Sequence, residues 1–431
     1  MNSLKTWLHA NRSLLTNAMS LIGTTGVSSV MGFAFWWVAA RYFPRSEVGF
    51  ASATVSAMMF LGAMAKFGVG AWLIGQLSRQ PAKTKSLLFT GALVNGVLGL
   101  TFGAAFALIA PLTSADFAPL STPLNLILFA IGVAVCAIAF VMDEAVIGLL
   151  RGDVQLMRNI FFAAAKLILL AGAGLLAIGI GGLGIYILWF CCEITSLLFL
   201  FRLPALRDGS IPIRIDGELL RGLGKGAVAH HMTNLAFDSP KTLMPVLVTM
   251  LLSADTNASF YVAWMIIGFV VLLPAALTSV LYAVGAAQPA LLRPKMRTTL
   301  LGSVLTASGA FVGIMLTADV VLGLFGSDYA RQAAPVLRLL TLAAFPLIIK
   351  FHYLAINRIY DRLAASIPVL LIGVVLELSF AVIGARTAGL IGLSAGWVLA
   401  NYLQVIFMVR PVINAYRGES QVENLKLRME N

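Results

Sequence analysis

Twelve long apolar segments, each bounded by proline, glycine or charged residues, constrain the fold of this 431-residue chain more than any other feature. A helix needs about 20 mainly apolar residues to cross a bilayer. Only 11% of the residues are charged, less than half the share typical of soluble domains. The sequence therefore predicts an all-α integral membrane protein without a sizeable domain outside the membrane. We predict spans at residues 14–40, 50–77, 86–111, 123–150, 155–179, 182–202, 228–252, 257–285, 298–325, 332–357, 363–386 and 389–414.

The 30 lysines and arginines are divided unevenly between the two sets of loops. The loops on the side of the N-terminus hold 21 of them, including Arg151 and Arg158 between the fourth and fifth spans. The opposite loops hold five, and four lysines lie inside spans. Because positively charged loops stay in the cytoplasm, both termini are predicted to be cytoplasmic. The net charge of +12 thus reflects topology, and we expect no nucleic-acid partner.

The spans divide into two groups of six. We predict an N-terminal lobe at 1–202, a cytoplasmic connector at 203–227, a C-terminal lobe at 228–414 and a cytoplasmic tail at 415–431. A weak repeat relates the halves, because the short external turn at the start of the second span recurs about 210 residues later. Two six-helix lobes of the same orientation around a central cavity suit transport by alternating access.

Several segments carry a resemblance to a known family. They are Ala39–Phe50, Lys66–Gly70, Asn234–Asp238 and Leu252–Asp255, followed by an eighth span with Pro274. The chain resembles bacterial polysaccharide flippases of the O-antigen type, in the multidrug/oligosaccharidyl-lipid/polysaccharide exporter superfamily.

That resemblance implies a flippase in the bacterial inner membrane. The implied substrate is a polyprenyl-pyrophosphate-linked oligosaccharide, which is moved from the inner to the outer leaflet for surface polysaccharide biosynthesis, including that of lipopolysaccharide. The implied partners are this lipid-linked oligosaccharide and membrane lipids, with a glycan polymerase and glycosyltransferases as further candidates. Spans one, two, seven and eight would line the cavity.

Ionisable residues inside the spans are the most informative positions, since each costs roughly 2.5–3.5 kcal/mol at the bilayer centre. The offset of about 210 residues relates Lys166 to the neighbourhood of Glu377, and Glu144 to that of Lys350. We therefore predict two ion pairs of reversed polarity, Glu144–Lys166 and Lys350–Glu377, one within each lobe. A proton-coupling role for one of the acids is the alternative.

Lys66, Asp238 and Lys241 are the candidate substrate-binding residues. Lys66 lies too deep in the second span to reach the external surface easily, so we expect it to face the cavity. Asp238 and Lys241 share one face of the seventh helix and could simply neutralise each other. The functional interpretation is that Lys66 and Lys241 bind the pyrophosphate, since lysine is a point-charge phosphate ligand.

The seventh span carries two further signals. Pro240 and Pro245 each remove a backbone donor, so we predict that the helix kinks or breaks there, beside the cavity. His230 and His231 open this span, and a proton relay is conceivable because histidine titrates near neutral pH. Ordinary interfacial polar residues are the simpler interpretation.

No motif supports chemistry on a substrate. The sequence lacks zinc-ligand spacing, HExxH and GxSxG, so we expect neither an enzyme nor a metal or cofactor site. Two other functions remain open. A drug/cation antiporter of the same superfamily should present acids to its substrates, whereas a membrane-embedded glycan polymerase or ligase should have a large external loop. The longest external connector predicted here is 112–122.

Overall fold

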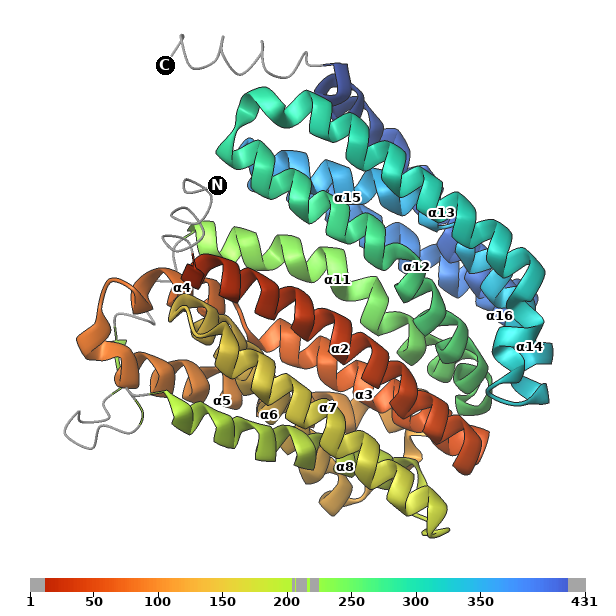
Figure 1. Ribbon diagram of the computed structural model, residues 1–431. Coiled ribbons are helices and arrows are strands. Elements are labelled where there is room, and N and C mark those ends of the chain that lie inside the picture. Colours follow the sequence, from red (N-terminus) through yellow and green to blue (C-terminus); the bar gives the residue numbers. More distant parts are fainter. Residues whose placement is uncertain (1–11, 204–205, 207–214, 218–224, 418–431) are drawn as a thin grey trace. The chain divides into compact units, whose positions relative to one another are not determined.

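The computed structural model describes residues 12–203, 206, 215–217 and 225–417 (Figure 1). Most of the predicted connector and of the predicted tail therefore lies outside the described residues. The chain divides into two compact units, Met1–Leu235 with Ser253–Asp255, and Ala236–Leu252 with Thr256–Asn431. The described residues of both units are folded mainly into helices.

The first unit contains seven α-helices and the start of an eighth in its described residues. They are α2 (Arg12–Tyr42), α3 (Arg45–Ala65), α4 (Val69–Leu77), α5 (Thr84–Thr113), α6 (Pro123–Gly148), α7 (Gly152–Leu175), α8 (Gly181–Leu197) and the first part of α11 (Lys225–Leu251). Helices α2 and α7 lie side by side, as do α5 and α6 (Figure 1). Small residues allow the second approach, because a Cβ atom at Gly99 would lie 2.7 Å from the Ala134 Cα.

The second unit continues from the rest of α11. Its other described helices are α12 (Ala254–Ala287), α13 (Leu292–Gly323), α14 (Ser327–Thr341), α15 (Ala344–Ile359) and α16 (Leu363–Arg417). The backbone of α16 leaves the helical conformation at Ala388 and Gly389. Its two halves turn back on each other there, because Gly384 contacts the Gly392 carbonyl and Gly396 contacts the Phe380 carbonyl.

The prediction of an all-helical membrane fold is confirmed, and helices occupy all twelve predicted spans. Eight described helices are long and apolar enough to cross a membrane, or nine if the pair α14 and α15, bent by 47°, is one span. Helix α16 contains the last two predicted spans, on either side of its kink. Helices α2 and α11, of 31 and 27 residues, coincide with the first and seventh predicted spans.

Two predicted spans differ in their continuity. The second span is broken between α3 and α4, where Phe67 and Gly68 adopt φ angles of 46° and 83°. The seventh span is not broken, because α11 is helical through Pro240 and Pro245, so of the predicted kink or break the break is wrong. Pro245 leaves the Lys241 carbonyl without its helical donor. The indole Nε1 of Trp264 donates to that carbonyl oxygen at 2.9 Å, which removes the penalty that would favour a break.

Candidate functional site

The break between α3 and α4 places Lys66 directly after α3, where its side chain faces α6. Lys66 follows the last residue of α3, and the amide of Val69 donates to its carbonyl at 2.8 Å, which closes the turn. The Lys66 Nζ lies 2.6 Å from Glu144 Oε1, and the two side chains are 21% and 28% exposed. This ion pair is therefore partly accessible, unlike the buried Lys350–Glu377 pair described below.

Gly70, in the first turn of α4, makes room for this ion pair. A Cβ atom at position 70 would collide with Oε2 and the carboxyl carbon of Glu144. The Glu144 carboxylate thus packs directly against the backbone of α4. The ammonium group of Lys66 also lies 5.7 Å from the centre of the Phe140 ring, within the range of a cation–π contact.

His231, on the first-unit part of α11, packs against the same break. Its side chain is 7% exposed, and its ring centre lies 6.4 Å from that of Phe67. The imidazole donates a hydrogen bond to the carbonyl of Met64, in the last turn of α3. This bond satisfies one of the carbonyls that the end of a helix leaves without an internal partner.

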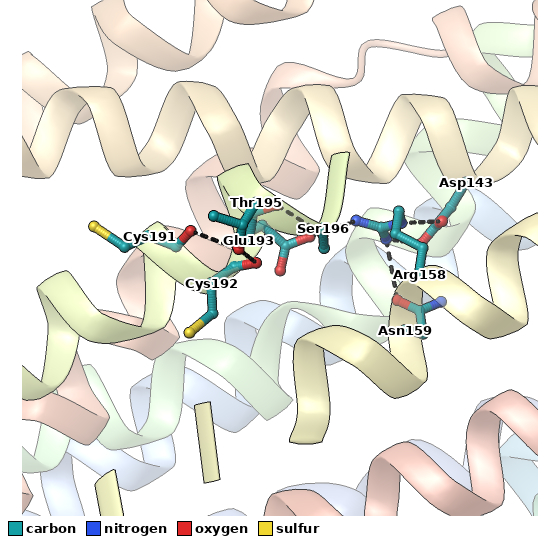
Figure 2. A network of polar contacts seen from close by, with 8 residues as sticks. All are labelled: Asp143, Arg158, Asn159, Cys191, Cys192, Glu193, Thr195 and Ser196. Carbon is teal, nitrogen blue, oxygen red and sulfur yellow. Dashed lines mark hydrogen bonds and ion pairs between the residues drawn. The ribbon is translucent and has the colours of Figure 1, made fainter. Parts of the chain in front are cut away.

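Arg158 forms the centre of a second polar cluster (Figure 2). It is 2% exposed and makes two hydrogen bonds to Asp143, at 2.6 and 3.1 Å, and one to Glu193 at 2.6 Å. Ser196 and Asn159 each accept a further bond at 3.1 Å. The assignment of Arg158 to a loop is wrong, because α7 begins at Gly152 and carries this side chain into the packed interior.

The predicted Glu144–Lys166 ion pair is not formed. Glu144 binds Lys66 instead, and Lys166 forms no ion pair with any carboxylate in the described part of the chain. The Lys166 ammonium is buried among three aromatic rings, 3.3 Å from the centre of Trp189, 4.2 Å from Phe162 and 5.4 Å from Phe35. The repeat offset failed here because it says nothing about which helices are lateral neighbours.

In the second unit, Lys350 and Glu377 form the ion pair that the sequence predicts. The Lys350 Nζ lies 2.7 Å from Glu377 Oε1, and both side chains are buried. Gln404 donates to the same carboxylate oxygen at 2.8 Å, and the Trp397 indole donates to Oε2 at 2.7 Å. The carboxylate therefore has three donors, which is the satisfaction that a buried charge requires.

Asp238 and Lys241 lie on the second-unit part of α11, and both residues are exposed. They form no ion pair with each other, so the interpretation as a local neutralising pair is wrong. Their spacing permits contact but does not impose it, since solvated charges gain little from pairing. Within the described ranges, no group of three or more histidine, cysteine or acidic side chains could hold a metal ion.

The sequence contains weak signals for the features that were missed. Arg158 follows Gly152 by six residues, which is compatible with a helix that begins earlier than the apolar run suggests. Trp264 and Trp397 carry indole donors inside apolar spans, and such donors usually find a partner when buried. Gly68, with a φ of 83°, is the sequence signal for the break, whereas Phe67 gives none because it is neither glycine nor proline.

The fold is that of the MATE transporters. A structure described as the inward-facing conformation of a multidrug resistance MATE family transporter of the MOP superfamily is 16% identical, with a TM-score of 0.69 over 94% of this chain and 98% of that one. The outward-facing conformation of a transporter described in the same terms gives 0.58, with 16% identity and 96% of each chain covered.

A third structure, from Pyrococcus furiosus Vc1, is a MOP superfamily transporter described as having a binding pocket of reverse polarity that suggests a different function. It is 15% identical, with a TM-score of 0.58 over 96% of both chains. No family model matches the sequence. No curated protein matches it either.

Proposed function

We propose that this protein is a transporter that moves a polyprenyl-pyrophosphate-linked oligosaccharide from the inner to the outer leaflet of a bacterial inner membrane. The proposal includes alternating access, since structures of this fold are described in both inward- and outward-facing conformations. It also includes cytoplasmic termini, which follow from the distribution of lysine and arginine between loops.

The ion pairing of the acids in the predicted spans is the observation that supports an anionic substrate. Of the six acids in the predicted spans, five are held in ion pairs within the described residues: Asp143, Glu144, Glu193, Asp319 and Glu377. A carboxylate already bound to lysine or arginine offers little attraction to a cationic substrate. Lys241 is exposed and belongs to no ion pair within the described residues, and a phosphate can replace Glu144 as the partner of the partly exposed Lys66. This balance supports an anionic head group, for which lysine is a suitable ligand.

An antiporter of drugs or other cations is the second candidate. It is favoured by the neighbouring structures that are described as multidrug resistance transporters. In this case Asp238, which forms no ion pair within the described residues, would be the residue that attracts the substrate cation.

The test is deletion of the gene followed by complementation. We expect deletion to cause a lipid-linked oligosaccharide to accumulate on the cytoplasmic leaflet, and the wild-type gene to restore surface glycan. Lys66→Ala should impair export, and Lys66→Glu should impair it more, because it places two carboxylates together. Arg79→Ala, which removes an exposed cation just after α4, is the matched control and should complement fully.

Membrane amounts of each variant separate loss of export from loss of protein. Normal surface glycan with Lys66→Glu would remove Lys66 from the mechanism. Uptake of a cationic dye by vesicles that is abolished by Asp238→Asn and unchanged by Lys66→Ala would favour the antiporter.

A further inference from the structure

Two buried histidines in this protein differ in how their ring nitrogens are used. His352, on α15, has both nitrogens bonded, Nδ1 to the Ile348 carbonyl at 2.8 Å and Nε2 to the Thr299 hydroxyl at 3.2 Å. His231 uses one nitrogen for the Met64 carbonyl, whereas its Nε2 is buried without a hydrogen-bond partner. A buried polar atom without a partner is costly, so its retention requires an explanation.

The environment of His231 contains the ion pair of the candidate site. The groups whose charges act on its ring are Lys66, at the end of α3, Glu144 on α6 and the adjacent His230 on α11. Because Nε2 has no partner, Nδ1 is the nitrogen that donates to Met64. In the neutral ring Nε2 then carries a lone pair and no proton.

We propose that His231 is a proton-accepting residue of an anion site at the break between α3 and α4, protonated at Nε2 when a phosphate group binds Lys66. This inference rests on the proposed anionic lipid substrate. It adds that His231 takes up a proton when that substrate binds. The proton comes from water and bonds to Nε2, and no other bond forms or breaks in the protein.

The charge balance of the site gives the physical reason. Lys66 and Glu144 together carry no net charge, so a phosphate that binds Lys66 leaves an uncompensated negative charge beside the buried His231 ring. Protonation of His231 restores one positive charge and turns Nε2 from an acceptor into a donor. The Met64 carbonyl keeps its bond from Nδ1 in both states, so the ring does not need to turn.

The experiment measures protons taken up on binding by the purified full-length protein. Geranylgeranyl pyrophosphate is titrated calorimetrically at about pH 8, well above the second phosphate pKa of about 6, in buffers that differ in ionisation enthalpy. We expect the wild-type protein to take up as much as about one proton per bound lipid. His231→Asn keeps a donor for the Met64 carbonyl but lacks Nε2, and it should take up none and bind roughly tenfold more weakly.

Two further variants separate a binding role from a structural one. His231→Gln retains an amide donor that can reach the position of Nε2 but cannot titrate, so it should lose the proton uptake while keeping more of the affinity. His352→Gln changes the histidine whose nitrogens are both bonded, and it should leave the proton uptake unchanged.

Each outcome is decisive. Normal binding without proton uptake, or uptake that persists in His231→Asn, overturns the role of His231 and leaves the flippase proposal standing. Failure of the wild-type protein to bind the lipid overturns both. Inorganic pyrophosphate, titrated in parallel, identifies the source of the anion. If inorganic pyrophosphate binds more weakly than the lipid, the site takes a lipid head group. Equal binding of the two overturns the assignment to a lipid.

Discussion

At position 70 only a hydrogen atom fits beside the Glu144 carboxylate, so the Lys66–Glu144 pair depends on a glycine that carries no charge. We expect Gly70→Ala to displace Glu144 and to reduce export roughly tenfold, the effect of losing one charge-assisted hydrogen bond. The measurement is surface glycan in a complemented deletion strain, normalised to membrane protein.

Gly75→Ala is the matched control, because it lies on the same helix and an added Cβ would meet nothing within 4 Å. It should export normally. Equal defects in the two variants would attribute the effect to the stiffness of α4 rather than to the ion pair.

Arg158 should be the most important single side chain for the stability of the first unit. Arg158→Met leaves the buried Glu193 and the partly buried Asp143 without their shared cation, which should destabilise the protein by about 3–5 kcal/mol. Arg151→Ala removes a cation from the exposed Arg151–Asp153 pair and should cost at most about 1 kcal/mol. Thermal unfolding in detergent measures both, and similar midpoints would contradict the structural role of the Arg158 cluster.

The sequence identifies which residues are buried and charged, but not how they pair. The Lys350–Glu377 pair formed as predicted, but consecutive helices joined by a short turn are not sufficient, because Glu144 and Lys166 lie on such helices and do not pair. For Glu144 the sequence predicted Lys166 alone, whereas the packing of α3 and α4 on α6 places Lys66 beside it. His231 could be recognised only as a polar residue at a helix start, because its unused nitrogen is a property of its neighbours.

In α11, a side chain of another helix replaces the backbone hydrogen-bond donor that Pro245 removes. Trp264→Phe removes the donor to the Lys241 carbonyl and should cost about 1–3 kcal/mol. In a Pro245→Ala background, the alanine amide can donate to that carbonyl itself, so the same substitution should cost less. Unfolding measurements on the four proteins of this double-mutant cycle should give a coupling of about 0.5–3 kcal/mol. Strict additivity would show that the indole bond does not compensate for Pro245.

Helix positions follow closely from apolar runs, whereas helix breaks do not. The twelve predicted ranges are all helical because the bilayer requires every backbone group to be bonded within its segment. The unexpected break lies at Phe67, and the expected one is absent at Pro240 and Pro245. In both cases the outcome depends on partners from other helices, which a single sequence does not reveal.

For the whole molecule, the charge asymmetry predicts the orientation of every loop. We expect a fluorescent protein fused after residue 431 to fluoresce, and alkaline phosphatase inserted within 112–122 to be active, because the first position is cytoplasmic and the second external. Alkaline phosphatase inserted near residue 208, in the predicted connector, should be inactive. The reverse pattern would invert the topology and with it the direction of the proposed transport.

The glycine contacts within α16 have a consequence for how the protein is made. Gly384, Gly392 and Gly396 let the two halves of this helix touch through their backbones, and close contact of this kind holds helices together within lipid. The second half of α16 therefore finds a docking surface on the segment synthesised immediately before it. This hairpin can begin to close as soon as its second half enters the bilayer.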